Sequence, residues 1–165
     1  MPTIEEYRHY PPYVQYCLLK NVCNIDLVFV GDVSLTDYSL NLIHETERDG
    51  VLRIPSKIDE KFADKLYNET FTVRLDNNSI VARLQESRTA ENIGQKVETY
   101  NANKARGLGA ITMDNSDYSV YSGEIQVCLQ DLLADKRVNL IGEVQNEYKA
   151  LLQLNMRGRK IMFVK

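Results

Sequence analysis

The stretch that decides the fold is ITMDNSDYSVYSGEIQV, residues 111–127. Two apolar, strand-like runs flank a polar region, which is the pattern of a β-hairpin. The polar region carries carboxylates, an amide and two tyrosines, namely Asp114, Asn115, Asp117, Tyr118, Tyr121 and Glu124. A surface hairpin needs turn residues, but it does not need so many aromatic and carboxylate groups so close together. This polar region is therefore a candidate for function.

Two interpretations of the polar region are open. As a binding edge, Asn115 and Glu124 would orient sugar hydroxyls, and the aromatic face of a tyrosine would stack on a pyranose ring. As a structural turn, Asn115 and Asp117 would form an Asx turn, and the two tyrosines would pack as a cover over the hairpin. Residue spacing alone favours the structural turn.

The chain around this stretch is mostly β. Short apolar segments separated by Asn, Asp and Gly turns predict strands at residues 51–54, 70–75, 80–84, 111–113, 123–129, 137–144 and 160–165. Helices are expected at 59–67 and 147–154, and residues 89–109 predict a long loop. A closed or nearly closed β-barrel fits many short strands, because closure removes unpaired strand edges.

Alternation along residues 137–144 predicts the two faces of that strand. Val138, Leu140 and Val144 share one face, and Arg137 and Asn139 share the other. An arginine on the same face as an asparagine is an unusual surface placement, so this face is a candidate for ligand contact.

The N-terminal part of the chain has a different character. A helix is expected over 13–21 after Pro11-Pro12, because proline is tolerated in a first turn. The continuous apolar run at 26–31, DLVFVG, predicts a strand buried on both faces. Ser34, with Asp37 as capping-box partner, should begin a helix that ends at Asp49-Gly50. This helix–strand–helix order is a slice of an α/β domain, since a parallel strand needs neighbours.

Composition excludes several classes of function. The net charge of −3 and pI of about 5.5 leave no basic stripe for nucleic acid. The chain has 3 cysteines in no zinc or CxxC spacing, which predicts reduced thiols, no metal and no cofactor. The N-terminus lacks the apolar core of a signal peptide, and no run is long enough to span a membrane. We therefore expect a cytoplasmic protein that binds neither nucleic acid nor membrane.

A family resemblance begins at these same residues. The stretch 111–127, followed by DKRVNLIGEV (135–144) and GRKIMF (158–163), resembles the C-terminal domain of the 6-phospho-N-acetylmuramidase family, often labelled outer surface protein. Upstream, VARLQESR (81–88) resembles a strand of that domain. PTIEEYR and DLVFVGD, at 2–8 and 26–32, resemble the closing strands of the family's N-terminal (β/α)8 barrel.

The resemblance implies both a fold and a function. The fold would be α+β and mainly β: a cyclophilin-like β-barrel domain over 51–165, preceded over 1–50 by a helix–strand–helix remnant of a (β/α)8 barrel. A complete barrel of that kind takes about 250 residues, so only its last part fits before Val51. These bacterial glycoside hydrolases serve peptidoglycan recycling. The chain would be their substrate-capping module, inactive alone, with a phosphorylated amino sugar of the N-acetylmuramic acid 6-phosphate type as its partner.

The resemblance also suggests a phosphate clamp. Arg83, Arg88 and Arg137 are candidates for it, because guanidinium groups bind phosphate through two parallel hydrogen bonds. The alternative is that these arginines are solvated and pair with Glu86 or Asp135. Together with Asn115, Tyr118, Tyr121, Glu124 and Asn139, they form the candidate substrate-binding set. No catalytic residue is assigned.

Three further candidates lie in the N-terminal part. Glu5, Arg8 and Asp32 would contact substrate, because residues just past a barrel strand face the active site. Alternatively, Asp32 caps the following helix and Glu5 is a solvent charge. The chain also departs from the family pattern. Tyr118-Ser119-Val120-Tyr121 stands where the family has Tyr-Gly-Arg-Tyr, so that arginine is absent.

Two other functions compete with the glycosidase module. The chain could be a free-standing, non-catalytic interaction protein, and an exposed barrel remnant would then make it self-associate as a homo-oligomer. A peptidyl-prolyl isomerase ranks last, since the chain has 0 tryptophans and no counterpart of the isomerase's arginine, phenylalanine and glutamine set.

Overall fold

The computed structural model describes residues 4–31, 35–88 and 96–165. Its strands form one seven-stranded sheet in the order β2-β7-β1-β6-β4-β5-β3. The strands are β1 (Leu52–Ile58), β2 (Thr70–Thr72), β3 (Val81–Arg83), β4 (Ala110–Asp114), β5 (Ile125–Cys128), β6 (Val138–Val144) and β7 (Lys160–Val164). The helices are α1 (Pro12–Asn21), α2 (Asp37–Asp49) and α3 (Glu60–Leu66), and the short 3-10 helices are η1 (Glu5–Tyr7), η2 (Gln85–Arg88), η3 (Ser116–Tyr121) and η4 (Asn146–Gln153).

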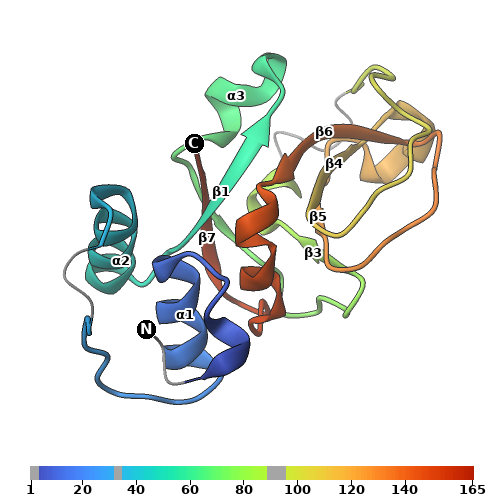
Figure 1. Ribbon diagram of the computed structural model, residues 1–165. Coiled ribbons are helices and arrows are strands. Elements are labelled where there is room, and N and C mark those ends of the chain that lie inside the picture. Colours follow the sequence, from blue (N-terminus) through green and yellow to red (C-terminus); the bar gives the residue numbers. More distant parts are fainter. Residues whose placement is uncertain (1–3, 32–34, 89–95) are drawn as a thin grey trace.

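The sheet curls into a half-barrel (Figure 1). Every strand pair is antiparallel except β1 and β7, which run parallel. The two edge strands approach each other just past their ends, where Val73 bridges to Leu84 and the Arg74 amide donates to the Arg83 carbonyl at 3.0 Å. This contact shortens the exposed edges, which is one way sheets avoid unwanted pairing. The structure therefore confirms a mixed α/β fold, with a curled half-barrel sheet and N-terminal helices.

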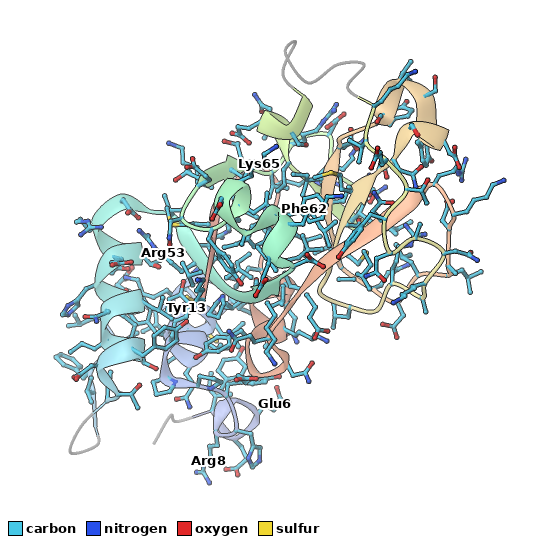
Figure 2. The ribbon with its side chains drawn as sticks, turned by 90° about the horizontal axis from the view of Figure 1, so that it is seen from above. Glu6, Arg8, Tyr13, Arg53, Phe62 and Lys65 are labelled. Carbon is cyan, nitrogen blue, oxygen red and sulfur yellow. The ribbon has the colours of Figure 1, made fainter. Side chains whose placement is uncertain are left out.

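Helices α1 and α2 pack together against the start of β1 (Figure 1). Tyr13 of α1 is fully buried, and its hydroxyl accepts a 2.9 Å hydrogen bond from the Arg53 amide on β1. Figure 2 shows these two side chains where the helices meet the sheet. Val14 and Leu18 continue the same apolar core toward Leu151 of η4. Burial of these apolar side chains is what attaches the helices to the sheet.

Most predicted elements are confirmed, but the strand predicted at 26–31 is wrong. These residues form no strand, and Leu27, Phe29 and Val30 are 66%, 80% and 57% exposed. A strand buried on both faces needs hydrogen-bonding partners on each side, and none of the described strands lies beside this run. The apolar sequence therefore lacks the structure that would bury it.

The second helix also begins later than predicted. Ser34 lies outside the described residues, and α2 begins at Asp37 with Thr36 as its N-cap. The Thr36 hydroxyl accepts from the Ser39 amide at 3.3 Å, which satisfies one free donor of the first turn. The predicted end is confirmed, since Gly50 terminates the helix in the left-handed conformation with φ 70°.

The predicted alternation along β6 is also wrong. Asn139 is fully buried and Ile141 lies in the apolar core, whereas Leu140 is only partly buried. The register against β4 shifts between Ile111 and Thr112, which pair with Gly142 and Leu140 and leave Ile141 as an extra residue. A β-bulge of this kind changes which side chains face inward. Among the described residues, none of the helices combines the length and apolar character that crossing a membrane requires.

Candidate functional site

The buried side chain of Asn115 holds the polar region in place through hydrogen bonds. It is fully buried at the N-terminus of η3, and its Oδ1 accepts from the Asp117 amide at 3.0 Å. Its Nδ2 donates to the Lys136 carbonyl at 2.9 Å and to Asn139 Oδ1 at 3.1 Å. The Asx turn is therefore confirmed, and the side-chain amide of Asn115 is already used within the protein.

Asn139 continues this network into the next loop. It is also fully buried, with Nδ2 donating to the Glu98 carbonyl at 2.9 Å and Oδ1 accepting from the Tyr100 amide at 3.0 Å. The two asparagines thus hold the loop at 96–101 and the chain around Lys136 against β6. A buried amide with all its groups bonded acts as a scaffold, so neither asparagine offers a free group to a ligand.

The exposed part of the polar region is an aromatic and cationic surface, here called the rim: Tyr118, Tyr121 and Arg137. The two tyrosine rings meet edge to face with centroids 5.4 Å apart. The Arg137 guanidinium lies 4.4 Å from the Tyr118 ring centroid and binds Asp135 through two hydrogen bonds of 3.0 and 2.8 Å. That pairing lowers the pKa of Asp135 to about 2. Aromatic faces beside a guanidinium group can hold a sugar ring and an anionic substituent.

Ser119 shapes the rim through its backbone. It interrupts η3 with φ 53° and ψ −111°, a conformation that glycine adopts far more readily than serine. The kink separates Tyr118 from Tyr121 and allows their rings to meet edge to face. Ser119 stands at the position of the glycine in the family pattern described above.

Two buried carboxylates, those of Asp114 and Glu124, stand at neighbouring ends of β4 and β5. Asp114 and Glu124 are 3% and 2% exposed, and Gln126 Nε2 lies 3.3 Å from a carboxylate oxygen of each. Burial, and next the charge of Glu124, raise the pKa of Asp114 to about 7. The sequence pointed to Glu124 but missed the role of Asp114. The available signal was that both acids stand at ends of facing strands.

The structure does not bring the predicted phosphate clamp together. Arg83 lies on β3 beside Asp76, whereas Arg137 precedes β6, and β5 and β4 stand between these strands. At about 4.8 Å per strand, their backbones are about 14 Å apart. Only the backbone of Arg88, at the end of η2, belongs to the described part of the chain. Arg137 is thus the candidate arginine that belongs to the rim.

The N-terminal candidates are equally separate from the rim. Glu5 and Arg8 pair with each other at 2.7 Å in and just after η1. Figure 2 places Arg8 at the bottom of the view, far from the strands β4 and β5 that flank the polar region. Asp32 lies outside the described residues. Among the described residues, Glu5 and Arg8 are therefore not brought together with Tyr118 and Tyr121.

Metal or thiol chemistry has little support in the described part of the chain. Within it, no three His, Cys, Asp or Glu side chains gather so as to hold a metal ion. Cys17, Cys23 and Cys128 are free thiols. Burial raises the pKa of Cys17 to about 12 and that of Cys128 to about 11, so both are poor nucleophiles at neutral pH.

Comparisons with known proteins agree with this architecture. The model of a family described as "6-phospho-N-acetylmuramidase, C-terminal" matches residues 51–164. A solved structure of a conserved protein of unknown function from Enterococcus faecalis superposes with a TM-score of 0.85 at 26% identity, covering 99% of this chain and 44% of that one. An uncharacterized B. cereus protein superposes with a TM-score of 0.81 at 22% identity, covering 99% and 47%. A search of curated proteins returned no match.

Proposed function

Because the chain belongs to the 6-phospho-N-acetylmuramidase C-terminal family, we propose that it is the substrate-binding module of a glycosidase acting on glycosides of N-acetylmuramic acid 6-phosphate. The observation that carries this proposal is the family match over 51–164, since the family description names both the enzyme and its C-terminal part. The chain spans 44% and 47% of the two solved relatives, so catalysis is assigned to sequence outside this chain.

The same proposal assigns each part of the chain to a domain. Residues 51–165 are a cyclophilin-like domain, and residues 1–50 are the closing segment of a (β/α)8 barrel. The apolar run at 26–31 supports this division, because it has the sequence of a buried parallel strand, yet Phe29 is 80% exposed. In a complete barrel, neighbouring strands would cover that run on both sides.

The rim is the proposed contact surface for the phosphosugar. Tyr118 or Tyr121 stacks on the pyranose ring, and Arg137 binds the 6-phosphate. The Nε and Nη2 groups of Arg137 donate to Asp135, and Nη1 donates in no hydrogen bond between described residues. The guanidinium therefore keeps a donor for phosphate while Asp135 fixes its orientation.

Hydrolysis by this chain alone is not part of the proposal. Glycoside hydrolysis usually needs two carboxylates on either side of the scissile bond. Asp114 and Glu124 are close together, but they are 3% and 2% exposed and both lie against Gln126. A sugar cannot enter between them without unfolding the strand ends, so they are assigned a structural role.

Calorimetric titration tests the proposed binding. N-acetylmuramic acid 6-phosphate is titrated into the wild type and the Arg137→Ala variant, and unphosphorylated N-acetylmuramic acid serves as the ligand control. We expect saturable heat with the phosphosugar and about 10-fold weaker binding in the variant, because a charge-assisted hydrogen bond contributes on the order of 1.4 kcal/mol or more. Equal binding of both sugars would contradict the phosphate contact.

One observation favours a second candidate, a non-catalytic interaction protein. Five apolar side chains between α1 and α2 are well exposed: Val22, Ile25, Leu27, Phe29 and Val30. An apolar patch of this kind often marks a protein–protein interaction site. In this alternative the chain self-associates through that segment, and the rim has no sugar ligand.

A further inference from the structure

A cavity of about 450 Å³ opens at the end of the half-barrel beside α3. Its apolar lining includes Phe62 from α3, Phe71 from β2, Met113 from β4 and Ile125 from β5. The volume lies within the range of pockets that hold small organic molecules. None of the residues predicted from the sequence as substrate contacts lines this cavity, so the rim does not account for it.

Three lysines also line the cavity: Lys61 and Lys65 from α3, and Lys96 from the loop before β4. None of the ion pairs between described residues includes these lysines. Figure 2 shows Lys65 and Phe62 together on α3, well away from Arg8. In a chain whose net charge is −3, this is a local concentration of positive charge.

The spacing of two of these lysines favours an anion between them. Lys61 and Lys65 are four residues apart on α3, where like charges repel and destabilise a helix. The Lys61 ammonium lies 4.8 Å from the Tyr100 ring centroid and 5.8 Å from that of Phe62, which fixes it at the edge of the cavity. An anion between the two ammonium groups would relieve their repulsion.

Two acids, Glu86 and Glu98, share the lining, so three lysines against two glutamates leave it with an excess of one positive charge. Glu86 already accepts a 2.7 Å hydrogen bond from the Thr72 amide, which holds its carboxylate toward the β2 backbone. Glu98 is exposed, and its carbonyl accepts from Asn139. By contrast, a second cavity of about 500 Å³ is lined by Lys57 and Lys149 together with Asp59 and Glu143, so its charges balance.

We infer that the cavity beside α3 binds a small organic anion that carries a phosphate or carboxylate group on a flat apolar body. The apolar body occupies the space among Phe62, Phe71 and Met113, and the anionic group meets Lys61 and Lys65. The site is separate from the rim. Val97 forms one wall of the cavity, and its backbone bonds to Ser116 and Ser122 on the side of η3. This inference does not rest on the proposed function.

Amide NMR titration of the whole chain with phenyl phosphate tests the site, with inorganic phosphate and phenol as partial ligands. We expect saturable shifts at Val97, Gly123 and Ile125 below about 10 mM phenyl phosphate, and weaker binding of phosphate or phenol alone. No saturable shift at these amides would overturn the inference. Phenol binding as tightly as phenyl phosphate would also overturn it.

A matched pair of variants isolates the lysines. Lys61→Ala/Lys65→Ala should weaken phenyl phosphate binding by about 10-fold or more, whereas Lys57→Ala/Lys149→Ala removes the same charge at the other cavity and should leave it unchanged. Alanine is a good helix former, so α3 should remain folded, and thermal melting checks this. Arg137→Ala should not change phenyl phosphate binding, which separates this site from the rim. Equal weakening of phenyl phosphate binding in both double variants would mean that only the net charge of the protein matters. That result would overturn the inference.

Discussion

Ser119 holds a backbone conformation that serine adopts only at a cost. With φ 53° and ψ −111°, it occupies a region that glycine enters freely, because glycine has no Cβ to clash. The Ser119→Gly variant should therefore be more stable by about 1 kcal/mol, measured as the free energy of unfolding in urea. Ser119→Val should lose stability. If glycine left the midpoint unchanged, the kink would not be strained.

Asp114 should make stability depend on pH. Its folded pKa of about 7 lies above the value of about 3.9 for an unfolded aspartate, so the folded state holds more protons between these limits. Stability contributed by this group therefore falls as pH rises from about 4 to about 7 and is constant beyond. Asp114→Asn should remove that part of the slope, because the asparagine oxygen can still accept from Gln126.

Urea unfolding at pH 5 and pH 8 provides the measurement. Relative to the wild type, Asp114→Asn should have a higher free energy of unfolding at pH 8 than it has at pH 5. Asp117→Asn, at an exposed neighbouring carboxylate, is the control and should follow the wild type. A wild-type slope that persists unchanged in Asp114→Asn would contradict the assignment.

At the residue scale, the sequence predicts side-chain chemistry better than side-chain access. The polar region at 114–124 was identified from its composition, and the Asx turn of Asn115 was predicted correctly. Burial was not predicted for Asn139, because its cover comes from a distant loop whose Glu98 carbonyl and Tyr100 amide bond to its side chain. The sequence of β6 alone cannot reveal a cover that another part of the chain supplies.

At the scale of elements, the junction between β1 and β6 depends on one glycine. A Cβ on Gly142 would lie 2.7 Å from the Lys57 carbonyl oxygen and 3.1 Å from Ile58 Cα, and both contacts are with backbone. Gly142→Ala should cost about 1–3 kcal/mol of unfolding free energy, because strand backbones cannot move apart freely. At Gly31, where a Cβ would meet no atom within 4 Å, alanine should be nearly neutral. Similar effects at both sites would contradict this close approach.

Most helices and strands were predictable from the sequence, and the run at 26–31 was the exception. The short strands were found from apolar runs and turn residues, and the end of α2 from Asp49-Gly50. The run at 26–31 reads as a buried strand, yet Leu27 and Phe29 are exposed. Local sequence fixes the preference for extended structure, but pairing requires neighbouring strands that none of the described residues supply. The cavity beside α3 was missed for a related reason, since its lining comes from five separate elements and the loops between them.

At the scale of the whole molecule, the exposed apolar segment should control association. Analytical ultracentrifugation of the wild type should reveal self-association that weakens in Leu27→Ser/Phe29→Ser, because these side chains are 66% and 80% exposed. Leu133→Ser, which removes a side chain 87% exposed in the loop between β5 and β6, is the control and should associate like the wild type. A monomeric wild type at high concentration would contradict this prediction.

We propose that this chain binds a phosphorylated amino sugar without cleaving it. The most direct test follows binding and turnover in one NMR sample, with a methyl glycoside of N-acetylmuramic acid 6-phosphate as ligand. We expect saturable shifts at Tyr118, Tyr121 and the Arg137 guanidinium, with the phosphorus and anomeric signals of the glycoside unchanged over days. Absence of any shift at the rim would contradict the binding claim, and appearance of the free sugar would contradict the assignment of catalysis to sequence outside this chain.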